Sequence, residues 1–243
     1  MREVRIYQAG FFFSLGQILE LSPEAGQHVG VVLRMQPGDK ITLFCGDNRE
    51  FAALLQEVHK KKVSVKIEEE RAINRESPRK IHLAQAISKG DRMEFVVQKA
   101  VELGVASISP IITSRSVVRL EAERMEKKLA QWQAVAIAAC EQSGRNQIPL
   151  INKVLALDDY LQQETAPLKL VLDPRESKGW RDYEFAQAEL ALLIGPEGGF
   201  SKEELRQIFS ADFNPLRLGP RVLRTETAAM AALSVLQAVC GDL

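Results

Sequence analysis

The chain has 243 residues, of which 46% are hydrophobic and 26% charged, a composition that excludes disordered and fibrous proteins. Lys plus Arg and Asp plus Glu both number 32, so any polyanion must be met by a local basic patch. Apolar runs stop short of the roughly 20 residues of a membrane helix. Charged residues occupy the N-terminus where a signal peptide is apolar. We therefore predict a cytoplasmic protein.

The cysteines and histidines argue against metal and disulfide chemistry. The three cysteines, Cys45, Cys140 and Cys240, are far apart and form no CxxC pair. The three histidines are equally dispersed, which disfavours metal hydrolysis and a histidine-based triad. We therefore predict reduced thiols and no bound metal.

The first 70 residues have the pattern of short strands separated by turns. Val4 and Ile6 alternate with polar neighbours, and Ser22-Pro23 has the residues of a helix start. Strand-like runs follow at residues 31–35, 41–44, 50–58 and 63–67. We predict a small β-barrel over residues 1–70. The charged segment that follows is assigned to a linker over residues 71–80.

From residue 81 to residue 243 predicted strands alternate with predicted helices. The strands are expected at residues 81–87, 105–112, 168–172, 191–194 and 215–218. Long helices are expected at 91–103 and 121–143, and further helices after the last two strands. The apolar spacing of the first helix places Met93, Val96, Val97, Ala100 and Val101 on one face. This alternation predicts an α/β domain with a parallel sheet, whose ligands bind beyond the carboxyl ends of the strands.

The loop after the strand at residues 191–194 is rich in glycine. Gly195, Gly198 and Gly199 allow close approach of the backbone to a ligand, and Pro196 stiffens the turn. Neither the phosphate-loop motif nor GxGxxG is present. The loop suits an adenine or a ribose recognised by backbone groups, and a purely structural turn is the alternative.

Two acidic residues of this region have different explanations. Ser201 and Glu204 have the spacing of a capping box, so a structural role is the default for Glu204. Glu197 lies inside the loop itself, where capping does not explain it.

Another loop, at residues 218–228, precedes a helix that is apolar on nearly every side. Thr225 is a reasonable N-cap, and Glu226 suits the positive end of the helix dipole. Arg224 has no such explanation and is placed to hold an anion or a polarised carbonyl, with a salt bridge as the alternative. The helix should be buried at an interface or beneath other parts of the chain.

The two C-terminal motifs, LIGPEGGFSKEE and LGPRVLRTETA, closely resemble the signature loops of the SPOUT methyltransferases, and specifically the 16S rRNA uracil-N3 methyltransferase (RsmE) family. The likeness extends to KGDRMEFVVQKAVELGV, ISPIITSRS, EQSGR and HVGVVLRMQPGD. It covers nearly the whole chain. One departure is Val4, where the family often has proline.

The resemblance implies a PUA-like β-barrel that binds RNA, joined to a SPOUT α/β domain with a trefoil knot. It also implies an S-adenosylmethionine cofactor, a homodimer and methylation of uracil N3 in 16S rRNA of the small ribosomal subunit. The cofactor-binding residues that it implies are Leu172, Asp173, Ile194, Gly195, Glu197, Gly198, Gly199, Leu218, Gly219, Leu223 and Arg224.

Methylation at uracil N3 requires removal of a weakly acidic proton, because the lone pair appears only afterwards. We expect Arg224 to stabilise the resulting anion. Glu197 or Glu204 is the expected proton acceptor, and the choice between them is open at this point.

RNA is expected to meet basic residues of both domains. The candidates are Arg2, Arg5, Arg34, Lys89, Lys99, Arg115 and Arg145. Two alternative functions of the whole protein remain. One is another SPOUT-type RNA methyltransferase, and the other is a non-catalytic ribosome-assembly factor that binds RNA and would need neither glycine loop. A nucleotide phosphotransferase would need a phosphate-binding lysine and metal carboxylates, which are not found.

Overall fold

The computed structural model describes residues 4–10, 12–60, 62–88, 90–116 and 122–243. The chain divides into two compact units. The N-terminal unit comprises residues 1–76 and 140–148, and the C-terminal unit comprises residues 77–139 and 149–243.

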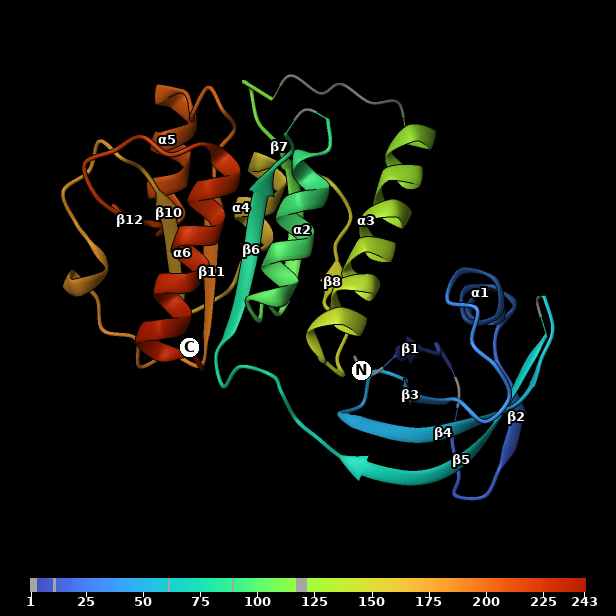
Figure 1. The fold of residues 1–243 in the computed structure, drawn as a ribbon. Coiled ribbons are helices and arrows are strands. Elements are labelled where there is room, and N and C mark those ends of the chain that lie inside the picture. Colours follow the sequence, from blue (N-terminus) through green and yellow to red (C-terminus); the bar gives the residue numbers. More distant parts are fainter. Residues whose placement is uncertain (1–3, 11, 61, 89, 117–121) are drawn as a thin grey trace. The chain divides into compact units, whose positions relative to one another are not determined.

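The N-terminal unit is built on a five-stranded sheet with the order β1-β3-β4-β5-β2 (Figure 1). Its strands are β1 (Arg5–Tyr7), β2 (Ile18–Glu20), β3 (Lys40–Phe44), β4 (Arg49–Val58) and β5 (Val63–Ala72). β1 pairs with β3 in parallel and the other pairs are antiparallel. Val63, Val65 and Ile67 point into the core and are fully buried, as their alternation predicts.

Two segments of this unit differ from the sequence prediction. Residues 31–35 were expected to form a strand. Instead α1 (Pro23–Gln27), capped by the Ser22 hydroxyl as predicted, continues into the π-helix η1 (His28–Val32). A short apolar run does not by itself distinguish strand from helix. β5 also extends to Ala72, inside the segment assigned to the linker.

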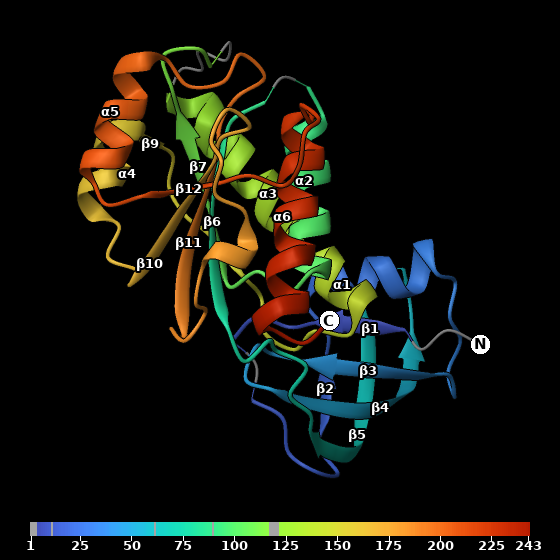
Figure 2. The same ribbon diagram turned by 90° about the vertical axis from the view of Figure 1, so that its left-hand side faces the viewer.

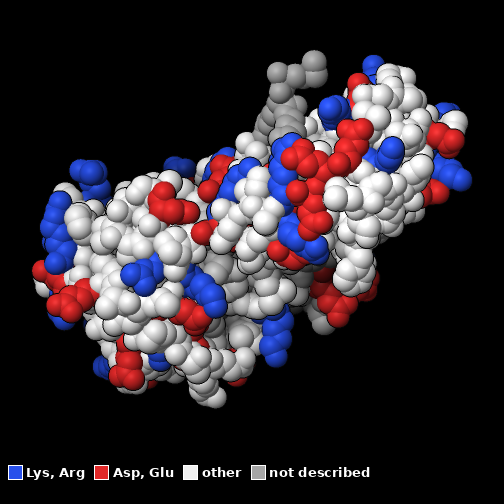
Figure 3. Space-filling view, turned by 90° about the horizontal axis from the view of Figure 1, so that it is seen from below, with Lys and Arg blue, Asp and Glu red and all other residues white. Residues whose placement is uncertain are grey.

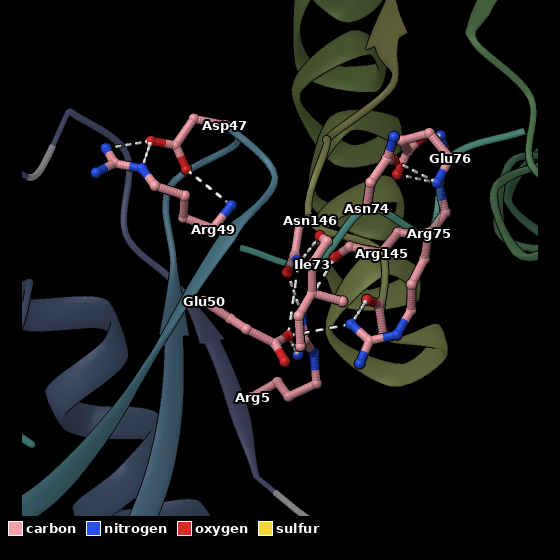
Figure 4. A network of polar contacts seen from close by, with 11 residues as sticks. Arg5, Asp47, Arg49, Glu50, Ile73, Asn74, Arg75, Glu76, Arg145 and Asn146 are labelled. Carbon is pink, nitrogen blue, oxygen red and sulfur yellow. Dashed lines mark hydrogen bonds and ion pairs between the residues drawn. The ribbon is translucent and has the colours of Figure 1, made fainter. Parts of the chain in front are cut away.

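A polar network joins residues 140–148 to the sheet inside the N-terminal unit (Figure 4). Glu50 accepts hydrogen bonds from Arg5 and from Arg75, at 2.5 and 3.1 Å. Arg5 also donates to the Asn146 side chain, and Arg145 forms an ion pair with Glu76. Burial raises the pKa of Glu50, but the hydrogen bonds and charges of the two arginines outweigh it and leave the pKa below its ordinary value.

The C-terminal unit contains a seven-stranded parallel sheet with the order β12-β10-β11-β6-β7-β8, in which β9 also pairs with β7. Its strands are β6 (Lys80–Ala86), β7 (Ser107–Ile112), β8 (Leu150–Ile151), β9 (Leu155–Ala156), β10 (Leu168–Leu172), β11 (Glu189–Ile194) and β12 (Asn214–Leu216). The helices are α2 (Arg92–Glu102), α3 (Ala122–Ser143), α4 (Leu157–Gln163), the short 3-10 helix η2 (Trp180–Asp182), α5 (Lys202–Ser210) and α6 (Thr225–Cys240). The predicted α/β class is confirmed.

Helices cover both faces of this sheet (Figure 2). α4 and α5 lie on one face, while α2 and α6 pack together on the other. The buried residues of α2 are the five that its sequence spacing predicts, which confirms that helix and its orientation. None of the described helices is long and apolar enough to cross a membrane.

The parallel arrangement brings the carboxyl ends of β10, β11 and β12 to one edge of the sheet. Each of these strands is followed by a loop that carries predicted cofactor-binding residues. Side chains and backbone groups from distant parts of the chain therefore meet at this edge.

Candidate functional site

The three loops enclose one cavity of about 520 Å³ within the C-terminal unit. All the predicted cofactor-binding residues line it, namely Leu172, Asp173, Ile194, Gly195, Glu197, Gly198, Gly199, Leu218, Gly219, Leu223 and Arg224. Apolar side chains from Leu216, Phe200 and Ala228 complete the wall. The cavity thus combines an apolar lining with exposed loop backbone, a combination that suits a nucleoside.

The glycine loop between β11 and α5 has a backbone that only small residues permit. Gly199 has a φ of +64°, in the left-handed region, and its N–H donates to the Pro196 carbonyl at 2.8 Å. A Cβ on Gly195 would lie 2.9 Å from the Phe200 ring. The loop therefore needs glycine at Gly199 for its conformation and at Gly195 for its packing.

The start of this loop is tied by a hydrogen bond to Thr225, the first residue of α6. The Thr225 hydroxyl donates to the Gly195 carbonyl at 2.7 Å, and it accepts from the Gln85 side chain at 2.9 Å. Thr225 was expected to cap α6. The structure corrects this, because Arg224 occupies the N-cap position and Thr225 is the first helical residue.

Two arginines from other loops hold the middle of the glycine loop. Arg115, after β7, donates to the Gly198 carbonyl at 2.7 Å. Arg92, at the start of α2, forms an ion pair with Glu197 at 2.7 Å. Sequence analysis did not single out Arg92 or Gln85, and no local pattern reveals pairings between residues so far apart in the chain.

Glu204 has a structural role that conflicts with its expected role as a base. One carboxylate oxygen accepts the Ser201 N–H at 2.7 Å and the other accepts the Ser114 N–H at 2.6 Å. Burial raises the pKa of Glu204, but these hydrogen bonds outweigh it and leave the pKa below its ordinary value. Glu204 does not line the cavity. The structure therefore corrects this part of the prediction and leaves Glu197 as the candidate proton acceptor.

Asp173 is buried at the end of β10 and bound to Arg175. The Arg175 guanidinium donates to both carboxylate oxygens, at 2.9 and 2.8 Å. Burial raises the pKa of Asp173, but the hydrogen bonds from Arg175 outweigh it and lower the pKa overall. Asp173 is thus an ionised acceptor in the cavity wall.

Arg224 lines the cavity and is exposed to solvent. Within the described ranges no carboxylate forms an ion pair with it. The salt-bridge alternative for Arg224 is therefore not observed among these residues, and its guanidinium is available to a ligand.

The predicted RNA-binding residues have very different surroundings. Arg5 and Arg145 are only 9% and 5% exposed and belong to the buried network of the N-terminal unit, so their predicted RNA contacts are corrected. An arginine in a buried ion pair cannot reach a phosphate without leaving its carboxylate uncompensated.

The other candidates are distributed as follows. Lys99 is paired with Glu102 at 2.8 Å, one helical turn away. Arg34 is exposed with a φ of 54°, and Arg115 is bound to the glycine loop. Arg2 and Lys89 lie outside the described residues. On the face drawn in Figure 3, basic and acidic side chains are interspersed, in keeping with the zero net charge.

Models of two protein families match the chain in agreement with this architecture. Residues 75–237 match an RNA methyltransferase domain, and residues 21–68 match an RNA methyltransferase PUA domain. The chain is therefore an RNA methyltransferase with an N-terminal PUA domain.

Relatives identify the family more closely. The chain is 36% identical over 240 residues to the ribosomal RNA small subunit methyltransferase E of Buchnera aphidicola subsp. Schizaphis graminum, covering 98% of this chain and 97% of the relative. It is 35% identical over 225 residues to the protein of the same name from Bacillus subtilis, covering 89% and 88%. The chain belongs to the ribosomal RNA small subunit methyltransferase E family.

Solved structures agree with this assignment. A Legionella pneumophila protein in complex with bound S-adenosylmethionine matches with a TM-score of 0.97 and 58% identity over the whole of both chains. The small subunit methyltransferase E of Neisseria gonorrhoeae, also bound to S-adenosylmethionine, matches with a TM-score of 0.93 and 37% identity over the whole of both chains.

Proposed function

We propose that this protein transfers a methyl group from S-adenosylmethionine to N3 of a uracil in the 16S rRNA of the small ribosomal subunit. The observation that carries the proposal is the meeting of the loops at residues 195–200 and 218–224 around one nucleoside-sized cavity. The family membership of the chain and the cofactor bound in two similar structures support it.

The lining residues fit the cofactor without a metal or a phosphate-binding lysine. The apolar walls suit adenine, and the glycine loop presents its backbone to a ligand. Among the described residues, no cluster of side chains could hold a metal ion. When bound, S-adenosylmethionine supplies a methyl group on a positively charged sulfur. This sulfur is a good leaving group when the methyl group is transferred.

The protein must then make uracil N3 nucleophilic. Arg224 lines the cavity, is exposed, and forms no ion pair with a carboxylate of the described residues, so it is placed to stabilise the negative charge that uracil oxygens acquire when N3 loses its proton. Glu197 lines the same cavity and is the candidate to accept that proton. Its ion pair with Arg92 keeps the carboxylate fixed on the loop.

The proposal includes a homodimer that uses the outer face of α6. One face of α6 packs inside the chain and carries the buried residues Ala229, Leu233 and Leu236. The other face carries half-buried apolar side chains at Met230, Ala231 and Val235, which a second copy would cover. The knotted threading of the C-terminal loops stays a prediction from the family resemblance.

Two measurements on the full-length protein test the proposal. Calorimetric titration should show one S-adenosylmethionine bound per subunit. Small subunits from cells lacking the enzyme should then accept labelled methyl groups in their 16S rRNA. Cofactor binding without methyl transfer would favour a non-catalytic RNA-binding protein, and absence of cofactor binding would overturn the proposal.

A further inference from the structure

A second cavity lies beside the cofactor cavity and has no part in the reaction described above. It also has a volume of about 520 Å³ and lies wholly within the C-terminal unit. Trp180, Arg181 and Asp182 line it from the loop after β10, and Arg217, Leu218 and Gly219 line it from the loop after β12. Leu218 and Gly219 also line the cofactor cavity, so the two cavities share one wall. We call the second one the Trp180 cavity.

Hydrogen bonds donated by backbone N–H groups hold the walls of the Trp180 cavity together. The Arg217 N–H donates to the Lys178 carbonyl at 2.8 Å. The Gly179 N–H donates to the Asp182 carboxylate at 2.8 Å, which closes the turn that carries Trp180. These bonds fix the two loops against each other, so the cavity is preformed.

The cavity presents an aromatic ring beside two arginines, Arg181 and Arg217, and one carboxylate, Asp182. The Arg181 guanidinium carbon lies 4.1 Å from the centre of the Trp180 ring. Trp180 is half-buried and Arg181 is exposed. Across the described chain no carboxylate forms an ion pair with Arg181 or Arg217. The Arg217 guanidinium donates through Nε to the Gly219 carbonyl at 3.1 Å, and the Asp182 carboxylate accepts from the Gly179 amide.

This combination matches the chemistry of single-stranded nucleic acid. Bases stack on aromatic rings and on guanidinium planes, while arginines neutralise the phosphates. Lys178 adds a second cation on the same loop, 5.9 Å from the Tyr183 ring.

We propose that the Trp180 cavity binds a nucleotide of the single-stranded rRNA segment that flanks the target base. The base stacks against the Trp180–Arg181 pair, and the adjoining phosphates face Arg181 and Arg217. The inference rests on the proposed function, because the wall shared with the cofactor cavity sets this nucleotide next to the base to be methylated.

Tryptophan fluorescence offers a direct test in the full-length protein. The chain has two tryptophans, and Trp132 is only 2% exposed in the core, so Trp132→Phe leaves Trp180 as the only reporter. Deproteinised, unmethylated 16S rRNA should quench this fluorescence. Failure of both the deproteinised rRNA and the intact small subunits to quench this fluorescence would overturn the inference.

Substitutions separate stacking from charge. Trp180→Leu and Arg181→Glu should each raise the Kd for the rRNA about tenfold, whereas Trp180→Phe should stay near the wild type because it retains a stacking ring. Lys127→Glu, an equal change of charge at a side chain that is 74% exposed on α3, is the matched control and should have little effect. An unchanged Kd in both Trp180→Leu and Arg181→Glu would overturn the inference.

Calorimetry with S-adenosylmethionine keeps this result separate from the proposed function. The Trp180 and Arg181 variants should bind the cofactor as the wild type does. If the wild type failed to methylate the rRNA but still bound it through Trp180, the proposed function alone would fail. If the wild type methylated the rRNA without dependence on Trp180, only the further inference would fail.

Discussion

Arg224 is the residue on which the proposed chemistry depends most. Its side chain lines the cavity and is not engaged by a carboxylate of the described chain, so Arg224→Ala should leave the cavity wall in place. We expect the single-turnover rate to fall about a hundredfold, because a positive charge near the uracil anion is lost from the transition state. Calorimetry should show little change in cofactor affinity.

The controls for Arg224 use pH and a conservative substitution. Raising the pH should restore part of the rate of Arg224→Ala, since more uracil loses its N3 proton unaided. Arg224→Lys should rescue poorly because an ammonium group lacks the planar fork of a guanidinium. A loss of cofactor affinity in proportion to the lost rate would make Arg224 a binding residue instead.

Cofactor binding should depend on the conformation of the glycine loop between β11 and α5. Gly199→Val should abolish cofactor binding, because valine does not tolerate a φ of +64° and the loop would have to change conformation. Gly199→Asn is the matched control, since asparagine adopts this region more readily and no atom lies within 4 Å of the added Cβ. Equal cofactor affinities in the two variants would show that the loop conformation is unimportant.

The start of α5 should give the protein a measurable dependence on pH. The pKa of Glu204 is lowered in the folded state, so its stabilising effect is present above the ordinary pKa of about 4.5 and is lost as the pH falls through the folded value. Glu204→Gln should cost about 1 kcal/mol of unfolding free energy near pH 7, measured in urea. The difference from the wild type should shrink as the solution becomes more acidic.

The neighbouring residue provides the control for Glu204. Glu203 is the residue of α5 immediately before Glu204, and its side chain is 69% exposed. Glu203→Gln should therefore change stability much less at either pH. A cost for Glu204→Gln that did not depend on pH would argue against an ionised cap.

Regular elements were predictable from sequence where the pattern was local and repeated. The buried face of α2 follows from its helical spacing, and the capping box of α5 follows from Ser201 and Glu204. The strands β8 and β9 have two residues each, too few to show a period, and they were not predicted. Residues 31–35 were wrongly expected to form a strand, because so short an apolar run does not distinguish strand from helix; residues 31 and 32 end the π-helix η1 instead.

Pairings between distant residues could not be predicted from the chain alone. The hydrogen bond from Thr225 to Gly195 and the ion pair of Arg92 with Glu197 join loops that only the fold brings together. The same holds for Arg5, whose partners Glu50 and Asn146 lie far along the chain. Family resemblance identified the loops, and the structure shows how they are held.

At the scale of the molecule, the two units are not consecutive stretches of sequence. Residues 140–148 belong to the N-terminal unit, although residues 140–143 are the end of α3, which begins in the C-terminal unit. Removing the first 77 residues would leave Arg145 without Glu76 and Asn146 without Arg5. Loss of one partner from a buried ion pair typically costs about 3–5 kcal/mol of unfolding free energy. Loss of function after this truncation would therefore not by itself show that the N-terminal unit binds RNA.

The proposed dimer is a second prediction at this scale. Light scattering of the wild type at micromolar concentration should give the mass of two subunits. Val235→Glu, on the half-buried outer face of α6, should shift the protein toward the monomer because a charge would be placed in an apolar interface. A wild-type monomer with full activity would contradict this assembly.

The most direct test of the central claim is to identify the methylated atom. Unmethylated small subunits are incubated with the full-length protein and S-adenosylmethionine, and the nucleosides of the 16S rRNA are then analysed by mass spectrometry against authentic standards. The account predicts N3-methyluridine at a single uracil, and its absence with the Arg224→Ala variant under the same brief incubation. A methyl group on another atom or another base, or none in the 16S rRNA, would contradict the account.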